Sequence, residues 1–267
     1  MERAAIHIAR WGRAGPRVIM IHGGTQGSVT GGERNFARQK SLAERGIQLL
    51  VPDRPGHGRS PNPGRPDDAE ADGACVAELL EDGAHLVGHS FGGCVALAAA
   101  AKRPRAVHSL TLIEPAMHAL ATSNPYVRRF VLSLLMARLF SLSAASRAKR
   151  FLKVIGIPAE MIGPLDREQL TRLGRSVVRG KLPSKATLLR ELGEIRRAEV
   201  PLLVVTGGWS PAFEASATVV AASGGGRRVV VKSEHHFPQL VSDEFNQILE
   251  AFLEESEARR KTGGSQL

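Results

Sequence analysis

The chain has few aromatic residues, few cysteines and no long apolar run. Only 4% of its 267 residues are aromatic, which argues against a stacking platform for single-stranded nucleic acid, so we expect no nucleic-acid partner. Its two cysteines, Cys75 and Cys94, stand without metal-ligand spacing, so we expect neither a disulfide framework nor a metal site. No run approaches the roughly 20 apolar residues of a membrane span, and the first ten residues lack a signal-peptide pattern. These absences predict a cytoplasmic protein without stable membrane insertion.

Positive charge, by contrast, is in excess and is concentrated in one segment. The net charge is +10, and residues 116–199 account for all of it, with 16 lysines and arginines against 6 aspartates and glutamates. Two interpretations stay open at this point. The arginine-rich face is merely solvated, or it attracts an anionic substrate or surface.

Strand and helix signals alternate along the chain, which predicts an α/β fold: a doubly wound, mostly parallel sheet with helices on both faces. The strand signals are Ala5–Ala9, Arg17–Ile21, Ile47–Val51, Ala84–Gly88, Val107–Ile113, Leu202–Thr206 and Arg228–Val231. The helix signals between them are Glu33–Arg45, Asp67–Leu80, Gly92–Lys102, Ala212–Ala222 and Gln239–Glu255.

Between the strands Val107–Ile113 and Leu202–Thr206 the sequence has only helix signals, interrupted by prolines. We therefore expect a core domain of residues 1–115 and 200–255, an all-helical insert of residues 116–199, and a frayed tail of residues 256–267. The stretch Phe130–Phe140 is apolar around most of its circumference and is flanked by arginine, which leaves a role at a membrane surface open.

The most informative motif is Gly88-His89-Ser90-Phe91-Gly92. A short apolar strand signal precedes it and an alanine-rich helix signal follows it, which is the setting of a nucleophile elbow. Glycine is needed on both sides because the turn is too tight for flanking side chains. Ser90 is thereby predicted to stand at the tip of the turn as a nucleophile, with its amide near a helix N-terminus.

Three further motifs follow the family order of the α/β hydrolases, which the chain resembles over roughly residues 5–255. They are His-Gly-Gly-Thr at 22–25, Pro-Asp-Arg-Pro-Gly-His-Gly at 52–58 and His-His-Phe-Pro at 235–238. The resemblance implies the α/β-hydrolase fold, a helical cap over the active site formed by the insert, and chemistry without a cofactor.

The resemblance also implies a base and an acid that follow Ser90 in the chain. The family histidine precedes an apolar residue and a proline, which His236 does, so we assign the base to His236 and regard His235 as a neighbour. A serine hydroxyl needs such a base, and the base needs an acid to orient it.

The acid is where the sequence departs from the family pattern. The loop after Leu202–Thr206, where an aspartate is usual, reads Gly-Gly-Trp-Ser-Pro at 207–211. A second family position lies at the end of the preceding strand, and there the chain has Glu114. We assign Glu114, and leave open Glu214, Glu234 and a dyad without an acid.

The oxyanion hole of this family consists of two backbone N–H groups, and here we expect those of Phe91 and Gly24. His22 is expected to brace the glycine loop. Asp53 and His57 are expected to be structural, and Arg54 (like Arg59) to be solvated or to brace the turn.

Together these features predict a serine hydrolase that cleaves a carboxylic ester or lactone of a small substrate, with an anionic group favoured if the basic insert selects it. A cofactor-free perhydrolase or a carbon–carbon bond hydrolase would use the same serine site. A non-catalytic, hydrolase-like binding protein is the alternative from another class, because the usual acid is missing.

Overall fold

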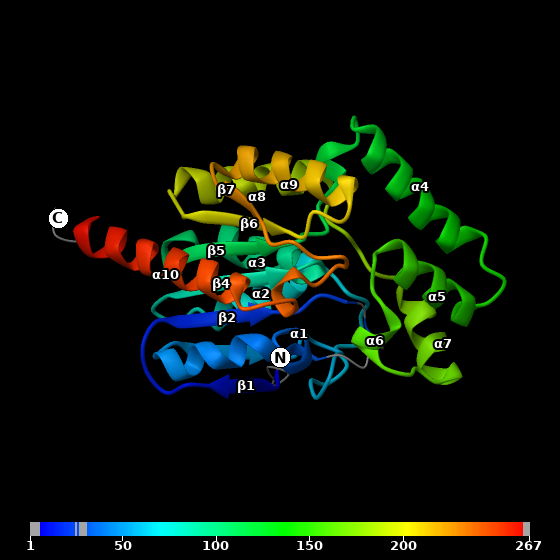
Figure 1. Cartoon of the computed structure of the whole chain (residues 1–267), viewed down its shortest axis with the longest axis horizontal. Coiled ribbons are helices and arrows are strands. Elements are labelled where there is room, and N and C mark those ends of the chain that lie inside the picture. The colour runs from blue at the N-terminus through cyan, green and yellow to red at the C-terminus, as the bar shows by residue number, and fades with distance from the viewer. Residues whose placement is uncertain (1–5, 25, 27–30, 264–267) are drawn as a thin grey trace.

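The computed structural model describes residues 6–24, 26 and 31–263, and it contains a seven-stranded sheet (Figure 1). The strand order is β1-β3-β2-β4-β5-β6-β7, and every neighbouring pair is parallel except β1 with β3. The predicted doubly wound α/β fold is therefore confirmed. The strands are β1 (Ile8–Trp11), β2 (Arg17–Ile21), β3 (Gln48–Pro52), β4 (Ala84–His89), β5 (Val107–Ile113), β6 (Leu202–Thr206) and β7 (Arg227–Val230).

Strands β2, β5 and β6 have the bounds predicted from the sequence, whereas β1 begins and ends later than the predicted Ala5–Ala9. Strand β1 lies at the edge of the sheet and pairs only with β3, from Ile8 opposite Pro52 to Trp11 opposite Leu49. Its bounds therefore follow the antiparallel register with β3, which local apolar character does not reveal.

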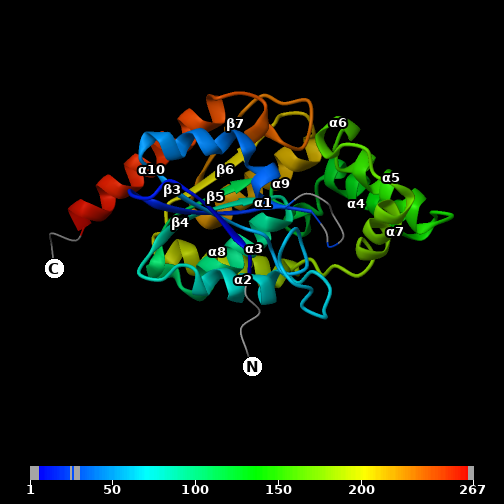
Figure 2. The ribbon, with the colours of Figure 1, turned by 90° about the horizontal axis from the view of Figure 1, so that it is seen from below.

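Helices cover both faces of the sheet (Figure 2). One face carries α2 (Ala69–Glu78), α3 (Phe91–Lys102), α8 (Lys185–Arg197) and α9 (Pro211–Gly224). The other face carries η1 (Ala37–Arg45) and α10 (Glu244–Gly263). In β2, Ile19 and Ile21 pack in the first layer and Val18 and Met20 in the second, as the alternation of a strand buried on both faces requires.

Two predicted helices are broken. The expected helix Glu33–Arg45 is a short α1 (Gly32–Asn35) followed by the 3₁₀ helix η1. The expected helix Gln239–Glu255 is the 3₁₀ turn η4 (Pro238–Leu240) followed by α10, which begins at Glu244. Spacings of three and four residues place apolar side chains on one face in both helix types, so the pattern does not separate them.

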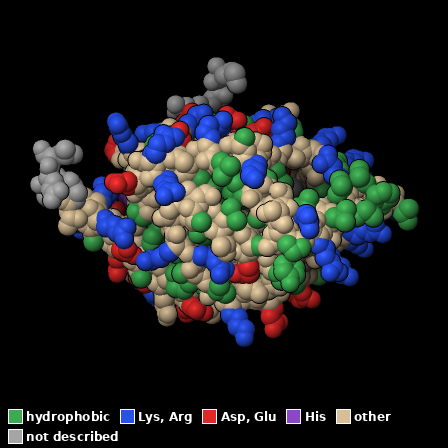
Figure 3. All heavy atoms as spheres, turned by 90° about the horizontal axis from the view of Figure 1, so that it is seen from above, with side chains coloured by type: hydrophobic (Ala, Val, Ile, Leu, Met, Phe, Trp, Pro, Cys, Tyr) green, Lys and Arg blue, Asp and Glu red, His purple; other side chains and the backbone are tan. Residues whose placement is uncertain are grey.

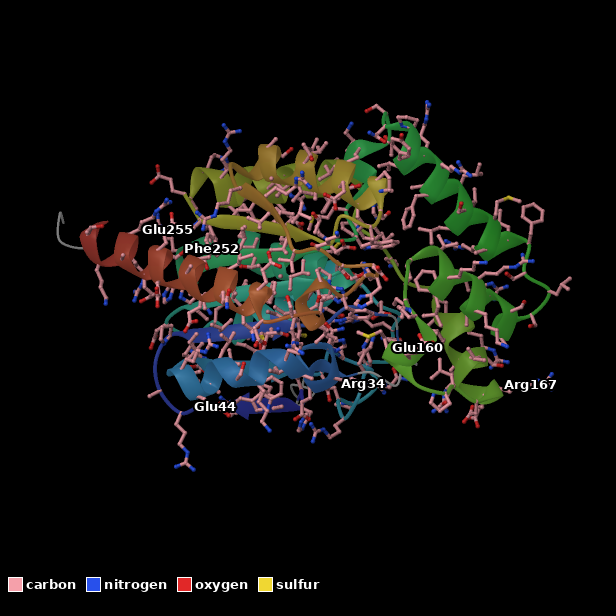
Figure 4. All side chains as sticks on the ribbon, in the orientation of Figure 1. Arg34, Glu44, Glu160, Arg167, Phe252 and Glu255 are labelled. Atoms are coloured by element: carbon pink, nitrogen blue, oxygen red, sulfur yellow. The ribbon has the colours of Figure 1, made fainter. Side chains whose placement is uncertain are left out.

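Helix α10 continues beyond the expected Glu255, so the predicted frayed tail of residues 256–267 is helical as far as Gly263. Ser256 is buried and its hydroxyl donates to the carbonyl of Phe252 at 2.7 Å. Figure 4 labels Phe252 and Glu255 on this helix, and Glu255 pairs with Arg227 of β7 at 2.9 Å. These contacts with the sheet extend the helix past the point where the apolar pattern weakens.

The insert between β5 and β6 is helical, apart from an isolated bridge of Lys181 to Asp68. It contains η3 (His118–Ala121), α4 (Pro125–Leu139), α5 (Ala144–Val154), α6 (Ala159–Ile162), α7 (Arg167–Ser176) and α8. Figure 1 shows α4 to α7 standing beyond one end of the sheet. Figure 4 labels Glu160 of α6 beside Arg34 of α1, where this group of helices meets the core.

Helix α8 belongs with the core layer instead. Its buried Leu188, Leu192 and Ile195 pack in the same cluster as α3 and α9. We therefore propose that the cap consists of α4 to α7, and that the boundary expected at residue 199 lies before α8.

None of the helices in the described part of the chain combines the length and the apolar character that crossing a bilayer requires.

Candidate active site

Ser90 stands in a strained turn between β4 and α3. Its φ and ψ are 55° and −122°, a conformation that is uncommon for any residue with a side chain. A Cβ on Gly88 would collide with the carbonyl of Gly92, and a Cβ on Gly92 would collide with the carbonyl of Ile21. Both glycines are thus required sterically, as the motif predicts. Ser90 is half-buried, at the carboxyl end of a central parallel strand.

Glu114 lies at the equivalent end of the adjacent strand β5. It is fully buried and has a φ of 44°, and its backbone N–H donates to the carbonyl of Val205 at 2.8 Å. The backbone N–H of Ser90 in turn donates to the carbonyl of Ile113 at 2.9 Å. The elbow and the turn after β5 are therefore tied together by the hydrogen bonding of adjacent strands.

The ring of His236 is bonded to the carboxylate of Glu114. Nδ1 of His236 lies 2.9 Å from Oε2 of Glu114, and both side chains are buried. The carboxylate also accepts the N–H of Gly207 on Oε1 at 2.7 Å and the indole N–H of Trp209 on Oε2 at 2.9 Å. These three donors hold the carboxylate in one orientation, with Nδ1 of His236 protonated and Nε2 left as the basic atom.

The other candidate carboxylates lie elsewhere. Glu214 accepts from the N–H of Gly208 and from the hydroxyl of Thr206, and it pairs with Arg228. Glu234 is exposed to solvent. Glu114 is therefore the candidate carboxylate that contacts His236. Glu214 instead links α9 to β7 through its pair with Arg228.

His235, next to the assigned base, points into its own turn. Its Nδ1 accepts the backbone N–H of Phe237, and its backbone N–H donates to the hydroxyl of Ser233. It is half-buried, whereas His236 is 1% exposed.

Burial shapes the ionisation of the buried pair. Desolvation raises the pKa of Glu114 to about 7, although the hydrogen bonds from Gly207 and Trp209 oppose this shift. Desolvation, with a smaller effect of the nearby His235, lowers the pKa of His236 to about 3. Both shifts favour the uncharged form of each group, so a neutral imidazole is present at physiological pH.

The glycine loop after β2 is braced by His22. Nδ1 of His22 lies 2.7 Å from the carbonyl oxygen of Gly23, and Nε2 accepts the backbone N–H of Arg54 at 3.0 Å. The hydrogen-bond network assigns the proton to Nδ1, and burial with the neighbouring Arg54 lowers the pKa of His22 to about 3. Because the carbonyl of Gly23 is held by His22, the N–H of Gly24 in the same peptide plane points the opposite way.

Of the two roles left open for Arg54, solvation and bracing, its burial excludes solvation. Its guanidinium donates to the carbonyl oxygens of Gly24 at 2.8 Å and His22 at 3.1 Å. It also pairs with Asp67 at 3.0 Å and Asp72 at 2.9 Å, and it lies over the ring of Phe91. Arg54 therefore braces the expected oxyanion loop from behind.

Phe91, the other expected oxyanion donor, is the first residue of α3. The first N–H groups of a helix have no partner within the helix, and they carry the positive end of its dipole. The backbone N–H of Gly93 donates to the backbone carbonyl of Ser90.

The site contains residues that the sequence did not single out. Trp209 occupies the loop where the family aspartate is usual, and it donates to Glu114 instead. Nε2–H of His89 donates to the backbone carbonyl of His236 at 2.7 Å. Phe213 lies 4.7 Å from the ring of His236 and 5.4 Å from that of Phe130 in α4. Only His89, inside the elbow motif, carried a sequence signal.

The connection between α5 and α6 contacts His236 directly. The backbone N–H of His236 donates to the carbonyl of Gly156, between α5 and α6, at 3.0 Å. Gly156 also lies so close to the ring of Trp209 that a Cβ would collide with it.

One group of side chains in the described residues has the spacing of metal ligands. Nε2 of His85 and Nδ1 of His108 each lie 3.3 Å from Oε1 of Glu257. Arg260 already pairs with this carboxylate at 3.2 Å. The histidines begin β4 and β5, at the opposite end of these strands from Ser90.

Comparison with known proteins gives the same fold and family. The sequence profile of the Alpha/beta hydrolase family matches residues 18–248. Lipase LipV of Mycobacterium tuberculosis is 37% identical over 151 residues, which are 54% of this chain and 54% of LipV. Pimeloyl-[acyl-carrier protein] methyl ester esterase of Chromobacterium violaceum is 41% identical over 116 residues, 43% of this chain and 40% of that protein.

Among solved structures, MenH from S. aureus superimposes with a TM-score of 0.69 at 17% identity, covering 94% of this chain and 99% of that one. The match to each of these sequence relatives spans about half of the relative's length or less.

Proposed function

Because the chain belongs to the alpha/beta hydrolase family, we propose that it is a serine hydrolase that cleaves a carboxylic ester or a lactone of a small substrate through an acyl-enzyme. The relatives named as a lipase and as a methyl ester esterase support an ester as the substrate class.

In the proposed acylation step, Nε2 of His236 removes the proton from Ser90 Oγ as this oxygen attacks the carbonyl carbon. The negative charge that develops on the carbonyl oxygen is stabilised by the N–H groups of Gly24 and Phe91. His236 then gives its proton to the departing alcohol oxygen, which leaves the acyl group on Ser90. Glu114 keeps Nδ1 of the imidazole protonated and stabilises the imidazolium that forms.

In the proposed deacylation step, water takes the place of the alcohol. Nε2 of His236 removes a proton from the water as its oxygen attacks the acyl carbon. The acid product leaves when the proton returns to Ser90, so the cycle consumes one water and needs no cofactor.

The observation that supports this proposal most is the bond of 2.9 Å between Nδ1 of His236 and Oε2 of Glu114. A buried carboxylate that orients a buried imidazole at the carboxyl ends of adjacent parallel strands has no evident structural purpose. Burying such groups costs free energy that a merely structural site would avoid with apolar residues.

The aromatic side chains around the base support an apolar group on the substrate. The ring of Phe213 in α9 packs against both His236 and Phe130 of α4. His118 packs 4.6 Å from the rings of both Phe130 and Phe213, and its Nδ1 is bonded to the hydroxyl of Ser216.

The test is hydrolysis of a panel of p-nitrophenyl esters of increasing acyl length and of several lactones, by the wild type and by Ser90→Ala. We expect Ser90→Ala to lose activity and labelling by a fluorophosphonate probe while it keeps its circular dichroism spectrum. A folded Ser90→Ala protein with near wild-type turnover would rule out the mechanism.

Hydrogen peroxide and β-diketone substrates, added to this panel, separate the alternatives. A perhydrolase would need hydrogen peroxide for its best rate, and a carbon–carbon hydrolase would be active on β-diketone substrates but poor on every ester. A binding protein would be neither labelled nor active.

A further inference from the structure

The cap exposes several large apolar side chains on α4 and just after it. Leu132, Leu139 and Phe140 are 56%, 61% and 62% exposed, and Leu142 is fully exposed. Helix α4 also exposes Tyr126, Val131, Leu135 and Met136. Leu132, Leu135, Met136 and Leu139 share one face of α4, so these four side chains form one patch.

Positive charge surrounds this patch without acidic residues beside it in the sequence. Residues 116–159 contain no aspartate or glutamate and seven basic residues. The basic residues are Arg128, Arg129, Arg138, Arg147, Lys149, Arg150 and Lys153. Figure 3 shows hydrophobic side chains gathered with Lys and Arg over the cap end of the molecule.

The arginines that donate hydrogen bonds here use backbone carbonyls, which leaves their charge uncompensated. Arg138 donates to Val178, Arg150 to Phe140, and Arg147 to Gly174. Among the ion pairs between described residues, none involves α4 or α5.

Two grooves run beside this face. One, of about 400 Å³, lies between α4 and α5, with Leu132, Met136 and Val154 as its apolar walls. Arg129, Arg150 and Lys153 supply its cations. The other, of about 230 Å³, reaches Phe130 and the start of α9. The grooves share Arg129, Ser133 and Val154, so the outer face is continuous with the aromatic side chains near His236.

We propose that the α4–α5 face docks the protein on an anionic lipid surface, with the leucines and Phe140 in the headgroup region and the arginines and lysines on the lipid phosphates. Leucine and phenylalanine beside a basic, acid-free face are the features that bind a helix in the plane of a charged membrane interface. Binding of this kind needs no spanning helix.

The positive charge of the α4–α5 face disfavours a second copy of the chain as its occupant. A second copy of the chain would bring seven cations against seven cations, which like-charge repulsion disfavours. An acidic protein would also complement the charge, and the experiment below distinguishes it. The proposal goes beyond the proposed function, because docking does not depend on the reaction that Ser90 performs.

The experiment is flotation of the full chain with vesicles of phosphatidylglycerol or of phosphatidylcholine, at low and at high salt. We expect binding to the anionic vesicles only, and weaker binding as salt rises. Leu139→Ser/Phe140→Ser and Arg129→Glu/Lys153→Glu should each reduce the affinity at least tenfold. Val241→Ser and Arg105→Glu change exposed residues on the core, and these variants should bind like the wild type.

Three outcomes would overturn the proposal. One is no binding to anionic vesicles by a wild type that is folded and monodisperse. Another is an equal loss in the core variants, which would indicate nonspecific attraction. The third is the absence of vesicle binding together with a different partner for the same face. That partner would be an acidic polypeptide, or a second copy seen as self-association in the ultracentrifuge, and the cap variants would abolish this binding. Labelling of Ser90 by a fluorophosphonate, measured in the same samples, keeps the result independent of the proposed function.

Discussion

At the scale of single residues, Ser90 and Glu114 both have a positive φ at the ends of adjacent strands. Backbone strain of this kind costs of order 1–3 kcal/mol per residue and persists where the surroundings enforce it. Here the surroundings are the hydrogen bonds between the strand ends and the donors on the carboxylate of Glu114. The strain holds both residues at the carboxyl ends of adjacent strands, where the carboxylate of Glu114 contacts His236.

We expect Glu114→Gln to lower kcat by about 10²–10⁴-fold, because the amide no longer keeps Nδ1 of His236 protonated or stabilises the imidazolium. Glu214→Gln is the control, since Glu214 bonds to Gly208, Thr206 and Arg228 instead. Steady-state kinetics on one p-nitrophenyl ester would measure both. Equal activities of the two variants would contradict the assignment of Glu114.

The pH dependence of kcat/KM should report the buried pair. In the proposed mechanism the active form has Glu114 ionised and His236 neutral, and burial raises the pKa of Glu114 to about 7. Activity should therefore rise with pH through about 7 and then level off.

In Glu114→Gln only His236 remains, and burial lowers its pKa to about 3, so the acid limb should move to lower pH. An acid limb that stays near 7 in this variant would assign the titration to another group. The profile is best recorded with an ester whose leaving group does not titrate in the range.

At the scale of elements, the connection between α5 and α6 joins the cap to the base. The carbonyl of Gly156 accepts the N–H of His236, and Gly156 packs on Trp209, which donates to Glu114. The position of the cap and the orientation of the acid and base are thereby coupled through three short contacts.

We expect Gly156→Ala to lower kcat/KM by about 10–100-fold, because a Cβ would push the cap away from Trp209, and small displacements of reacting groups have effects of this size. Gly46→Ala is the matched control: its φ is 82° against 66° for Gly156, but a Cβ there meets nothing within 4 Å. If both variants lose activity and stability alike, backbone strain alone would explain the result.

The glycine loop after β2, which carries the proposed oxyanion donor Gly24, is held by another element, the turn after β3 that carries Arg54. Arg54→Met should destabilise the fold by about 3–5 kcal/mol, because the buried Asp67 and Asp72 lose its guanidinium, although Asp72 keeps its pair with Arg65. Arg59→Met, at a side chain that is 58% exposed, should change the free energy of unfolding by less than about 1 kcal/mol. Urea unfolding measures both, and similar midpoints would show that the buried network is not needed for stability.

At the scale of the whole molecule, charge is divided unevenly. Residues 116–199 carry a net charge of +10, while the rest of the chain contains 20 basic and 20 acidic residues. The positive end of the molecule is therefore the end where the cap lies, beyond the carboxyl ends of the strands (Figure 1).

We expect this field to favour esters with a carboxylate distant from the scissile bond, by raising the rate at which they meet the protein. Added salt should lower kcat/KM for such an ester, since the Debye length is about 10 Å at 0.1 M, and should leave a neutral ester of equal size nearly unchanged. Identical salt profiles for the two esters would mean that the charge is only solvated surface. The comparison needs a soluble substrate and no lipid.

The sequence by itself determined the α/β class, three of the strands to the residue, the elbow around Ser90 and the family. These features depend on local rules. Apolar runs indicate buried strands, and two glycines with a serine between a strand and a helix permit only one kind of turn. The residue type at each position carries this information without reference to distant parts of the chain.

Only the tertiary structure decided which carboxylate meets His236. Glu114, Glu214 and Glu234 are equivalent as residue types, and a separation of 122 positions in the chain says nothing about a distance of 2.9 Å. The same reason applies to Arg54, for which solvation and bracing both stayed open until two aspartates and the glycine loop after β2 were found around it. Pairing between distant residues depends on how the strands and the cap pack, and that packing is a property of the whole chain.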